Sequence, residues 1–294
     1  MRFKYSFGHR AGTVVIYVFL LIVAFITLYP FIYVVSMSVS GPDAVLKNQV
    51  WLWPVGFSFG SFKLIFASKS IFTSYYNTLW YTAVGTAISL FVTLCAAYAL
   101  SRKEFFARGA VMFLIMVTML FSGGLIPLFI LVSRLGLYNT RWAIVLPAAV
   151  ATYNLIVART YFSTSIPDSL PESAKIDGCS DVGILWRIVL PVSKPIVSVL
   201  ILFYAIGRWN SWFPETIYLL KAELQPLQVY LRKILIVNSQ LDIITGMEDS
   251  LERLAYVQQI KYSMIVVAIL PIICLYPFLQ KYFVQGVMLG SIKA

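Results

Sequence analysis

The sequence predicts an all-α protein that crosses a membrane with six helices. Apolar residues make up 60% of the 294 positions, well above the roughly 45–50% typical of soluble domains. Charged residues make up only 12%, and mean hydropathy is +0.84. Long stretches almost free of charge recur along the chain, near the length of about 20 residues that spans a bilayer.

The six expected spans share this low charge and lie at about residues 11–37, 73–100, 109–133, 142–161, 195–217 and 262–283. The first is expected to be a retained helix. Its apolar run exceeds the roughly 7–15 residues of a signal peptide, and no small-residue cleavage site follows. The fifth is interrupted by Arg208. We treat residues 1–294 as one transmembrane domain.

The distribution of basic residues predicts the orientation of the chain. Residues 1–10 carry three basic side chains and no acidic one, and the short link at 101–109 carries three against one. Short positively charged segments favour the cytoplasm, so we expect both termini and the loop 165–194 there. The segment 217–261 is then extracytoplasmic.

Other classes of site lack support. Cys95, Cys179 and Cys274 lie far apart, and the single histidine, His9, has no cysteine cluster near it, so neither a disulfide framework nor a metal site is expected. The net charge of +11 is scattered over connecting segments, which fits anionic lipid better than nucleic acid. No phosphate-binding G-x-x-x-x-G-K-[ST] loop is present, so the chain is not expected to hydrolyse ATP.

The loop 165–194 is unusually polar for this chain and predicts two short helices. Glu172 lies close to the start of the first, after capping residues at 168–169, where an acidic side chain is favourable. Gly178 permits a turn with positive φ that ends this helix. The second is expected to begin at Ser180 and to end at Pro191. Its apolar residues recur on one face, at Ile184, Leu185, Ile188 and Val189.

The fixed spacings in this loop resemble the EAA loop of bacterial ABC importer permeases, E-A-A-x3-G-x9-I-x-L-P. The one departure is serine at the second position. The resemblance implies that this loop docks on ATPase subunits through Glu172, Ser173, Ala174, Asp177, Gly178, Ile188, Leu190 and Pro191.

Three further stretches, residues 121–140, 224–236 and 276–294, resemble the oligosaccharide branch of these permeases. The implied fold is that of a type I importer permease, in the bacterial inner membrane. The implied partners are a second homologous permease, two ATPase subunits that bind ATP and magnesium, and an extracytoplasmic solute-binding protein. No cofactor is expected on this chain. The implied substrates are complex or acidic oligosaccharides, with alginate as one candidate.

Gly286 and Gly290 predict an irregular tail after the last span. By the same resemblance, this tail, which includes Lys293, contacts the ATPase interface.

Arg208 is the one charge well inside a span, roughly 20 Å along a helix from Pro195. Such a residue costs about 2.5–3.5 kcal/mol on insertion scales, and no acidic residue lies one turn away in its span. We expect water, a partner subunit or substrate to compensate it. With Trp209, Asn210 and Trp212 it forms a candidate sugar path. The alternative is an interfacial aromatic belt, with Arg208 reaching outward.

Within 217–261, apolar residues at helical spacing predict a helix over about 227–235. The resemblance places this region against the binding protein, and a helix on the lipid surface is the alternative.

Two other functions are disfavoured. An ion-coupled secondary transporter usually has ionisable residues in several spans, whereas five of the six spans have no charged residue apart from Arg159 and Lys281 near their ends. A membrane enzyme needs a cluster of catalytic side chains, which the sequence does not provide.

Overall fold

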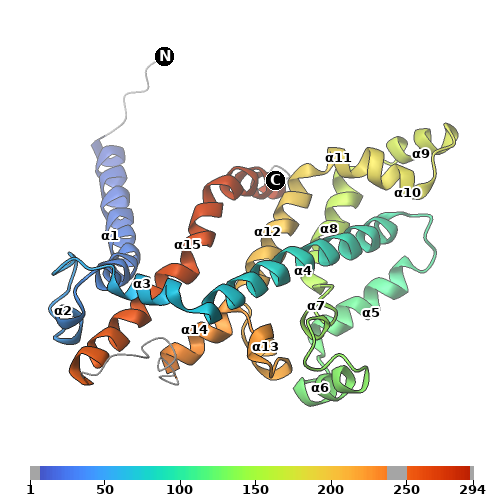
Figure 1. Ribbon diagram of the computed structural model, residues 1–294. Helices are drawn as coiled ribbons and strands as arrows, with labels where there is room; N and C mark the ends of the chain where they lie inside the picture. Colours follow the sequence, from blue (N-terminus) through green and yellow to red (C-terminus); the bar gives the residue numbers. More distant parts are fainter. Residues whose placement is uncertain (1–6, 237–249, 292–294) are drawn as a thin grey trace. The chain divides into compact units, whose positions relative to one another are not determined.

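The structure is a computed structural model, and it describes residues 7–236 and 250–291 (Figure 1). The regular elements over these ranges are helical. The chain forms two compact units, one from Met1–Lys69 with Leu231–Leu270 and the other from Ser70–Tyr230 with Pro271–Ala294.

The first unit contains three amino-terminal helices and the first part of the last helix. These are α1 (Phe7–Ser38), α2 (Pro42–Leu46), α3 (Gly60–Ala67) and α15 (Ser250–Ser291). Every residue of α1 from 14 to 32 is exposed. An apolar helix that buries so little within its own chain is suited to contact lipid or another subunit.

Polar side chains of α15 satisfy the carboxyl end of α1. The carbonyl of Ser38 accepts hydrogen bonds from Ser263 Oγ at 3.1 Å and from Gln259 Nε2 at 3.3 Å. Gln259 also donates to the carbonyl of Ser40 at 2.6 Å, and Ser61 bonds Ser263 at 2.7 Å. The last carbonyls of a helix have no partner within it, so in apolar surroundings they need such donors.

The second unit is built mainly from short helices around the long helix α4. Its elements are α4 (Lys69–Ser101), α5 (Arg108–Leu120), α6 (Leu125–Arg134), α7 (Trp142–Val145), α8 (Thr152–Ser165), α9 (Ser169–Ile176), α10 (Asp181–Ile184), a π-helical turn (Leu185–Val189), α11 (Leu190–Val192), α12 (Lys194–Asn210), α13 (Phe213–Tyr218) and a 3₁₀ turn (Ala222–Leu224). The helix α14 (Leu227–Ile236) carries the chain on. Its position confirms the helix expected over 227–235.

The core of the second unit forms where α8 packs against its neighbours. Ala158 and Phe162 of α8 are fully buried with Ala97 and Tyr98 of α4, and Leu200 of α12 joins the same cluster. α8 also contacts α5 and α12 directly. This packing holds the base from which the loop 165–194 leaves.

Three helices in the described ranges are long and apolar enough to cross a membrane: Gly12–Ser38, Lys69–Ser101 and Leu254–Cys274. Two sharply bent pairs raise this number to five if each is one span. They are Arg108–Leu120 with Leu125–Arg134, bent by 115°, and Asp181–Val192 with Lys194–Asn210, bent by 89°. The six-span topology stays a prediction.

Three of the expected spans are interrupted, and one of them, 195–217, is divided at residues 211–212 between α12 and α13. The stretch 109–133 is divided at residues 121–124, where Gly124 has φ +82°, a conformation that other residues adopt at a cost. The stretch 142–161 is divided at residues 146–151, which contain Pro147. Proline lacks the N–H that would continue a helix.

The carboxyl-terminal tail was expected to be irregular, but it is helical as far as Ser291. The helix α15 continues through Gly286 and Gly290 as far as Ser291. Each glycine costs a helix only about 1 kcal/mol, which is too little to end a helix of 42 residues.

We predict that Gln259→Leu lowers the free energy of unfolding by about 1–2 kcal/mol, because it leaves the carbonyls of Ser38 and Ser40 short of donors. SDS titration of the purified chain in mixed micelles measures this change. Gln258→Leu is the matched control, since Gln258 is exposed on the same helix. Equal effects of the two substitutions would contradict the structural role of Gln259.

Candidate functional site

The first helix of the loop 165–194 begins at Ser169, with Asp168 in the capping position. The Asp168 side chain makes no capping hydrogen bond, and instead accepts one from Lys103 Nζ at 2.7 Å. This bond holds the pKa of the Asp168 carboxyl below its ordinary value. The sequence therefore located the cap position but not its partner, which lies 65 residues earlier.

Gly178 ends α9 in the left-handed conformation predicted from the sequence, with φ +79°. Its N–H bonds the carbonyl of Lys175 at 3.0 Å, and the N–H of Cys179 bonds the carbonyl of Ala174 at 2.9 Å. These two bonds define the Schellman motif. A Cβ at position 178 would meet nothing within 4 Å, so backbone conformation and not crowding favours glycine here.

The second helix begins as predicted, with Ser180 Oγ accepting from the N–H of Gly183 at 3.3 Å. Ile184, Leu185 and Val189 are buried, which confirms the predicted apolar face. The second helix was expected to end at Pro191, but it does not. The chain widens into the π-helical turn Leu185–Val189 and continues through α11 to Val192. We attribute this to proline, which cannot donate to the preceding turn and crowds it.

The outer side of the loop is exposed and partly apolar. Ile176 is 87% exposed and Val182 68% exposed. The predicted coupling residues divide by burial: Ala174 is buried, Ile188 and Leu190 are half-buried, and the exposed ones are Glu172, Ser173, Asp177, Gly178 and Pro191. The loop thus has an inner face packed on the core and an outer face open for a partner.

The loop meets α12 nearly at a right angle. The segment Asp181–Val192 and the helix Lys194–Asn210 differ in direction by 89°. At the bend, the N–H of Ser193 bonds the carbonyls of Val189 and Leu190 at 3.0 and 3.1 Å. A hydrogen-bonded bend of this kind lets a displacement of the loop tilt the helix.

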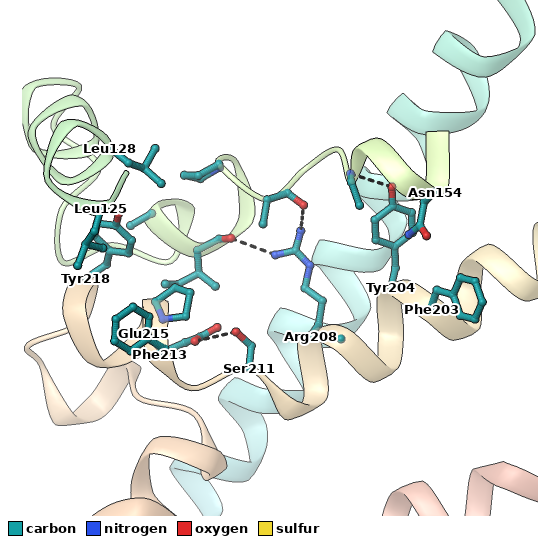
Figure 2. A pocket seen from close by; sticks show the side chains of 17 residues that line it. Leu125, Leu128, Asn154, Phe203, Tyr204, Arg208, Ser211, Phe213, Glu215 and Tyr218 are labelled. Atoms are coloured by element: carbon teal, nitrogen blue, oxygen red, sulfur yellow. Dashed lines mark hydrogen bonds between the residues drawn. The ribbon is translucent and has the colours of Figure 1, made fainter. Parts of the chain in front are cut away.

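A cavity of about 480 Å³ lies at the other end of α12 (Figure 2). Its walls come from α6, the interruption between α7 and α8, α12 and α13. The lining is mostly apolar and includes Leu125, Leu128, Phe203 and Phe213, with polar groups from Asn154, Tyr204, Arg208, Ser211 and Glu215. Such a volume lies in the range of about 300–1,000 Å³ typical of ligand sites.

Arg208 is bound to the interruption between α7 and α8 (Figure 2). Its Nη1 donates to the carbonyl of Ile144 at 3.0 Å, and its Nη2 donates to the carbonyls of Val145 and Ala148 at 3.3 and 2.8 Å. Nη2 also bonds Ser89 Oγ of α4 at 3.0 Å. These carbonyls are available because the helix is interrupted there.

This finding corrects one expectation. We expected water, a partner or substrate to compensate the Arg208 charge, whereas carbonyls of the same chain accept its hydrogen bonds. These acceptors lie 60 or more residues from Arg208 along the chain, so no local pattern indicated them.

Gly85 of α4 makes room for the guanidinium. A Cβ at this position would lie 2.7 Å from Arg208 Nε and 2.9 Å from Cζ, which is closer than a Cβ approaches a heavy atom to which it is not bonded. The absence of a side chain at position 85 therefore allows α4 and α12 to pack with Arg208 between them.

The remaining polar groups of the cavity are held in place. Tyr204 Oη bonds Thr93 Oγ1 at 2.6 Å and accepts from the N–H of Ala151 at 3.2 Å. Glu215 is 2% exposed and accepts from Ser211 Oγ at 2.9 Å.

Only one of the four predicted sugar-path residues lines the cavity. Arg208 does, while Trp209 is buried against Tyr75, with ring centroids 6.1 Å apart. Asn210 donates to the carbonyl of Ile206 at 3.0 Å, and Trp212 packs against Phe213. Glu215, a neighbour of Arg208 that the sequence also indicates, lines the cavity, and the lining residues missed by sequence reasoning, Tyr204 and Ser211, recur at helical spacing with Arg208. That periodicity was the available signal.

The predicted tail residues are described only in part. Gly286 and Gly290 lie within α15, and Lys293 lies outside the described residues.

Comparison with known proteins identifies relatives over nearly the whole chain. Residues 85–289 match the model of the family described as binding-protein-dependent transport system inner membrane component. The polygalacturonan/rhamnogalacturonan transport system permease protein YtcP of Bacillus subtilis (strain 168) is 41% identical over 97% of this chain and 99% of its own. Protein LplC of the same organism is 38% identical over 91% of this chain and 90% of its own.

A solved structure agrees. A chain of a bacterial ABC transporter involved in the import of the acidic polysaccharide alginate superposes with a TM-score of 0.87 and 36% identity. The match covers 96% of this chain and 100% of that one. The chain therefore belongs to the family of binding-protein-dependent transport system inner membrane components, and it is the permease subunit of an ABC importer whose ATPase is a separate subunit.

Proposed function

We propose that this permease imports acidic oligosaccharides across the bacterial inner membrane by alternating access, driven by ATPase subunits docked on the loop 165–194. The observation that carries the coupling role is the two-faced loop. It packs on the core through Ile184 and Val189, exposes Ile176, and meets α12 at 89°.

The proposed complex contains four kinds of protein. A second homologous permease pairs with this chain, two ATPase subunits bind ATP and magnesium, and an extracytoplasmic binding protein delivers the sugar. Both termini and the loop 165–194 then lie in the cytoplasm. The segment 217–261 faces the binding protein, and membrane lipid surrounds the exposed helices. The charge distribution of the link 101–109 supports this orientation.

The coupling mechanism follows from the loop geometry. Closure of the ATPase dimer on binding ATP displaces the docked loop. Because the bend at Ser193 is hydrogen-bonded, the displacement tilts α12. The cavity is lined by the far part of α12, so its shape changes with the tilt.

We place the sugar path along this cavity, with the aromatic and apolar lining as its main contact surface. Arg208 stays a proposed wall of the path with Glu215, while Trp209, Asn210 and Trp212 lie outside the cavity lining. The preference for acidic sugars is supported by the substrates for which two relatives are named. Alginate and polygalacturonan are carboxylate-bearing polymers.

We predict that acidic oligosaccharides stimulate the ATPase activity of the purified complex more than neutral oligosaccharides of equal length. The assay uses the complete importer with its binding protein and a panel of both sugar classes. Equal stimulation by both classes would contradict the substrate proposal, and no stimulation by any sugar would contradict the import function.

We predict that Gly178→Val uncouples the importer, because the required positive φ costs a β-branched residue about 1–2 kcal/mol. Sugar-stimulated ATPase activity and transport into proteoliposomes should both fall. Gly178→Asn is the matched control, since asparagine tolerates this conformation and should retain most coupling. Normal copurification of the ATPase and normal transport with valine would show that the docking assignment is wrong.

The same assay tests the tail. Deletion of residues 286–294 should lower ATPase stimulation while leaving membrane insertion intact, if the tail contacts the ATPase interface. Unaltered stimulation would remove the tail from the coupling surface.

We predict that Phe213→Cys reacts with a water-soluble thiol reagent in the assembled importer and that acidic sugar slows the reaction. Phe213 lines the cavity and is 48% exposed. The control is Leu79→Cys, which is 54% exposed on α4 outside the cavity. Both are made in a variant without the three native cysteines. Failure of position 213 to react in every nucleotide state would contradict a sugar path along the cavity.

A further inference from the structure

Three consecutive charged residues in the link between α4 and α5 contact the segment that forms the proposed coupling loop. Arg102 Nη2 donates to the carbonyl of Phe162 at 3.1 Å, and Lys103 Nζ lies 2.7 Å from the Asp168 carboxylate. Glu104 forms an ion pair with Lys175. Successive residues of the link thus reach successive points along α8 and α9, at positions 162, 168 and 175.

Arg102 is the most firmly held of the three. Its side chain is 12% exposed, its guanidinium lies 5.2 Å from the centroid of the Tyr98 ring, and its Nε donates to Ser101 Oγ at 3.0 Å. Phe162 is one of the last four residues of α8, whose carbonyls lack partners within the helix. A cation here both satisfies a carbonyl and complements the negative end of the helix.

The contact is reciprocal. Arg159 of α8 directs Nε to the carbonyl of Leu100, near the end of α4, at 3.4 Å. The rings of Tyr98 and Phe162 pack edge to face between the two helices, with centroids 6.4 Å apart. The end of α8 is therefore bound by Arg102, directly after α4, and the end of α4 is bound by Arg159 of α8, over a buried aromatic pair. The two helix ends are tied together.

The ion pairs leave the outer face of the loop open. Pro171 and Ala174 face the core, and Glu172 and Ile176 stay exposed. Lys175 also lies 3.4 Å from Asp181, so it links α9 to α10 as well as to the link. Hydrogen bonding to Glu104 raises the pKa of Lys175 above its ordinary value. The pKa of Asp168 is lowered, so both groups stay charged around neutral pH.

We propose that Arg102, Lys103 and Glu104, together with Arg159, form a second attachment of the coupling loop, by which its movement reaches α4 and α5 as well as α12. Arg102 is a positioning residue, since it acts through α8 and touches no substrate. The proposal rests on the proposed coupling function of the loop 165–194.

Charge reversal tests the outer part of this attachment in the complete importer with its ATPases and binding protein. Glu104→Lys and Lys175→Glu should each lower sugar-stimulated ATPase activity and transport per ATP by roughly two- to fivefold, the range of an exposed ion pair. The double exchange of the two charges should restore part of the coupling, because the pair between positions 104 and 175 forms again while position 175 now repels Asp181. Unaltered coupling in both single variants, or no recovery in the double variant, overturns the role of this pair.

Arg102→Gln tests the inner part and should lower transport per ATP by about tenfold, because it leaves the carbonyl of Phe162 without its charged donor. Arg108→Gln is the matched control. Arg108 is the first residue of α5, directly after the link, and forms no side-chain hydrogen bond or ion pair within the described ranges. Equal effects of the two substitutions overturn the assignment of Arg102.

A distance measurement separates positioning from a general loss of stability. Spin labels are attached through Phe106→Cys on the link and Ser169→Cys at the start of α9, both exposed, in a variant without the native cysteines. The distance should be the same in the nucleotide-free and ATP-bound states, and should differ between states once Arg102→Gln is added. If the distance changes between the two nucleotide states while Arg102 is still present, the proposal is overturned.

The wild-type complex distinguishes a failure of the proposed function from a failure of the second attachment. Absence of sugar-stimulated ATPase activity in the wild type counts against the proposed function, whereas normal wild-type coupling with insensitive variants counts against the second attachment alone.

Discussion

The architecture depends on satisfying backbone carbonyls where helices end or break away from water. An unpaired carbonyl in apolar surroundings costs about 1–3 kcal/mol or more, so every interruption of a helix needs donors from elsewhere. In the first unit, Gln259 supplies them to the end of α1. In the second, Arg208 supplies them to the interruption before α8, and Arg102 to the end of α8.

The same requirement decides whether Arg208 is costly or useful. Inserting an arginine costs about 2.5–3.5 kcal/mol, while the carbonyls of Ile144 and Val145 left unpaired would together cost about 2–6 kcal/mol, and Ala148 would keep only its bond from Ser89. The arginine and the interruption therefore compensate each other, and Gly85 is the small residue that lets them meet. The charge is thus part of the packing between α4, α7 and α12, whatever passes through the adjacent cavity.

Local features were predictable from the sequence, and features that depend on distant partners were not. The positive φ of Gly178, the cap at Ser180 and the buried face of Ile184 and Val189 follow from neighbouring residues, and the structure confirms them. The continuation of the helix past Pro191 depends on a π-helical turn. The donors to residues 144–148 come from Arg208 of α12 and Ser89 of α4, more than 50 residues away, and hydropathy alone does not reveal the breaks that create those acceptors.

These bonds also determine where the second unit is stiff. The bend at Ser193 is closed by backbone hydrogen bonds, and the interruption at 146–151 is bound by Arg208 and Tyr204. The bend between α5 and α6 differs. Within the described residues no side-chain hydrogen bond crosses 121–124, and a Cβ at Gly123 or Gly124 would meet nothing within 4 Å. A displacement that reaches α5 through the 102–104 link can therefore be absorbed at this bend without breaking a side-chain hydrogen bond there, so α6 can keep its place in the cavity wall.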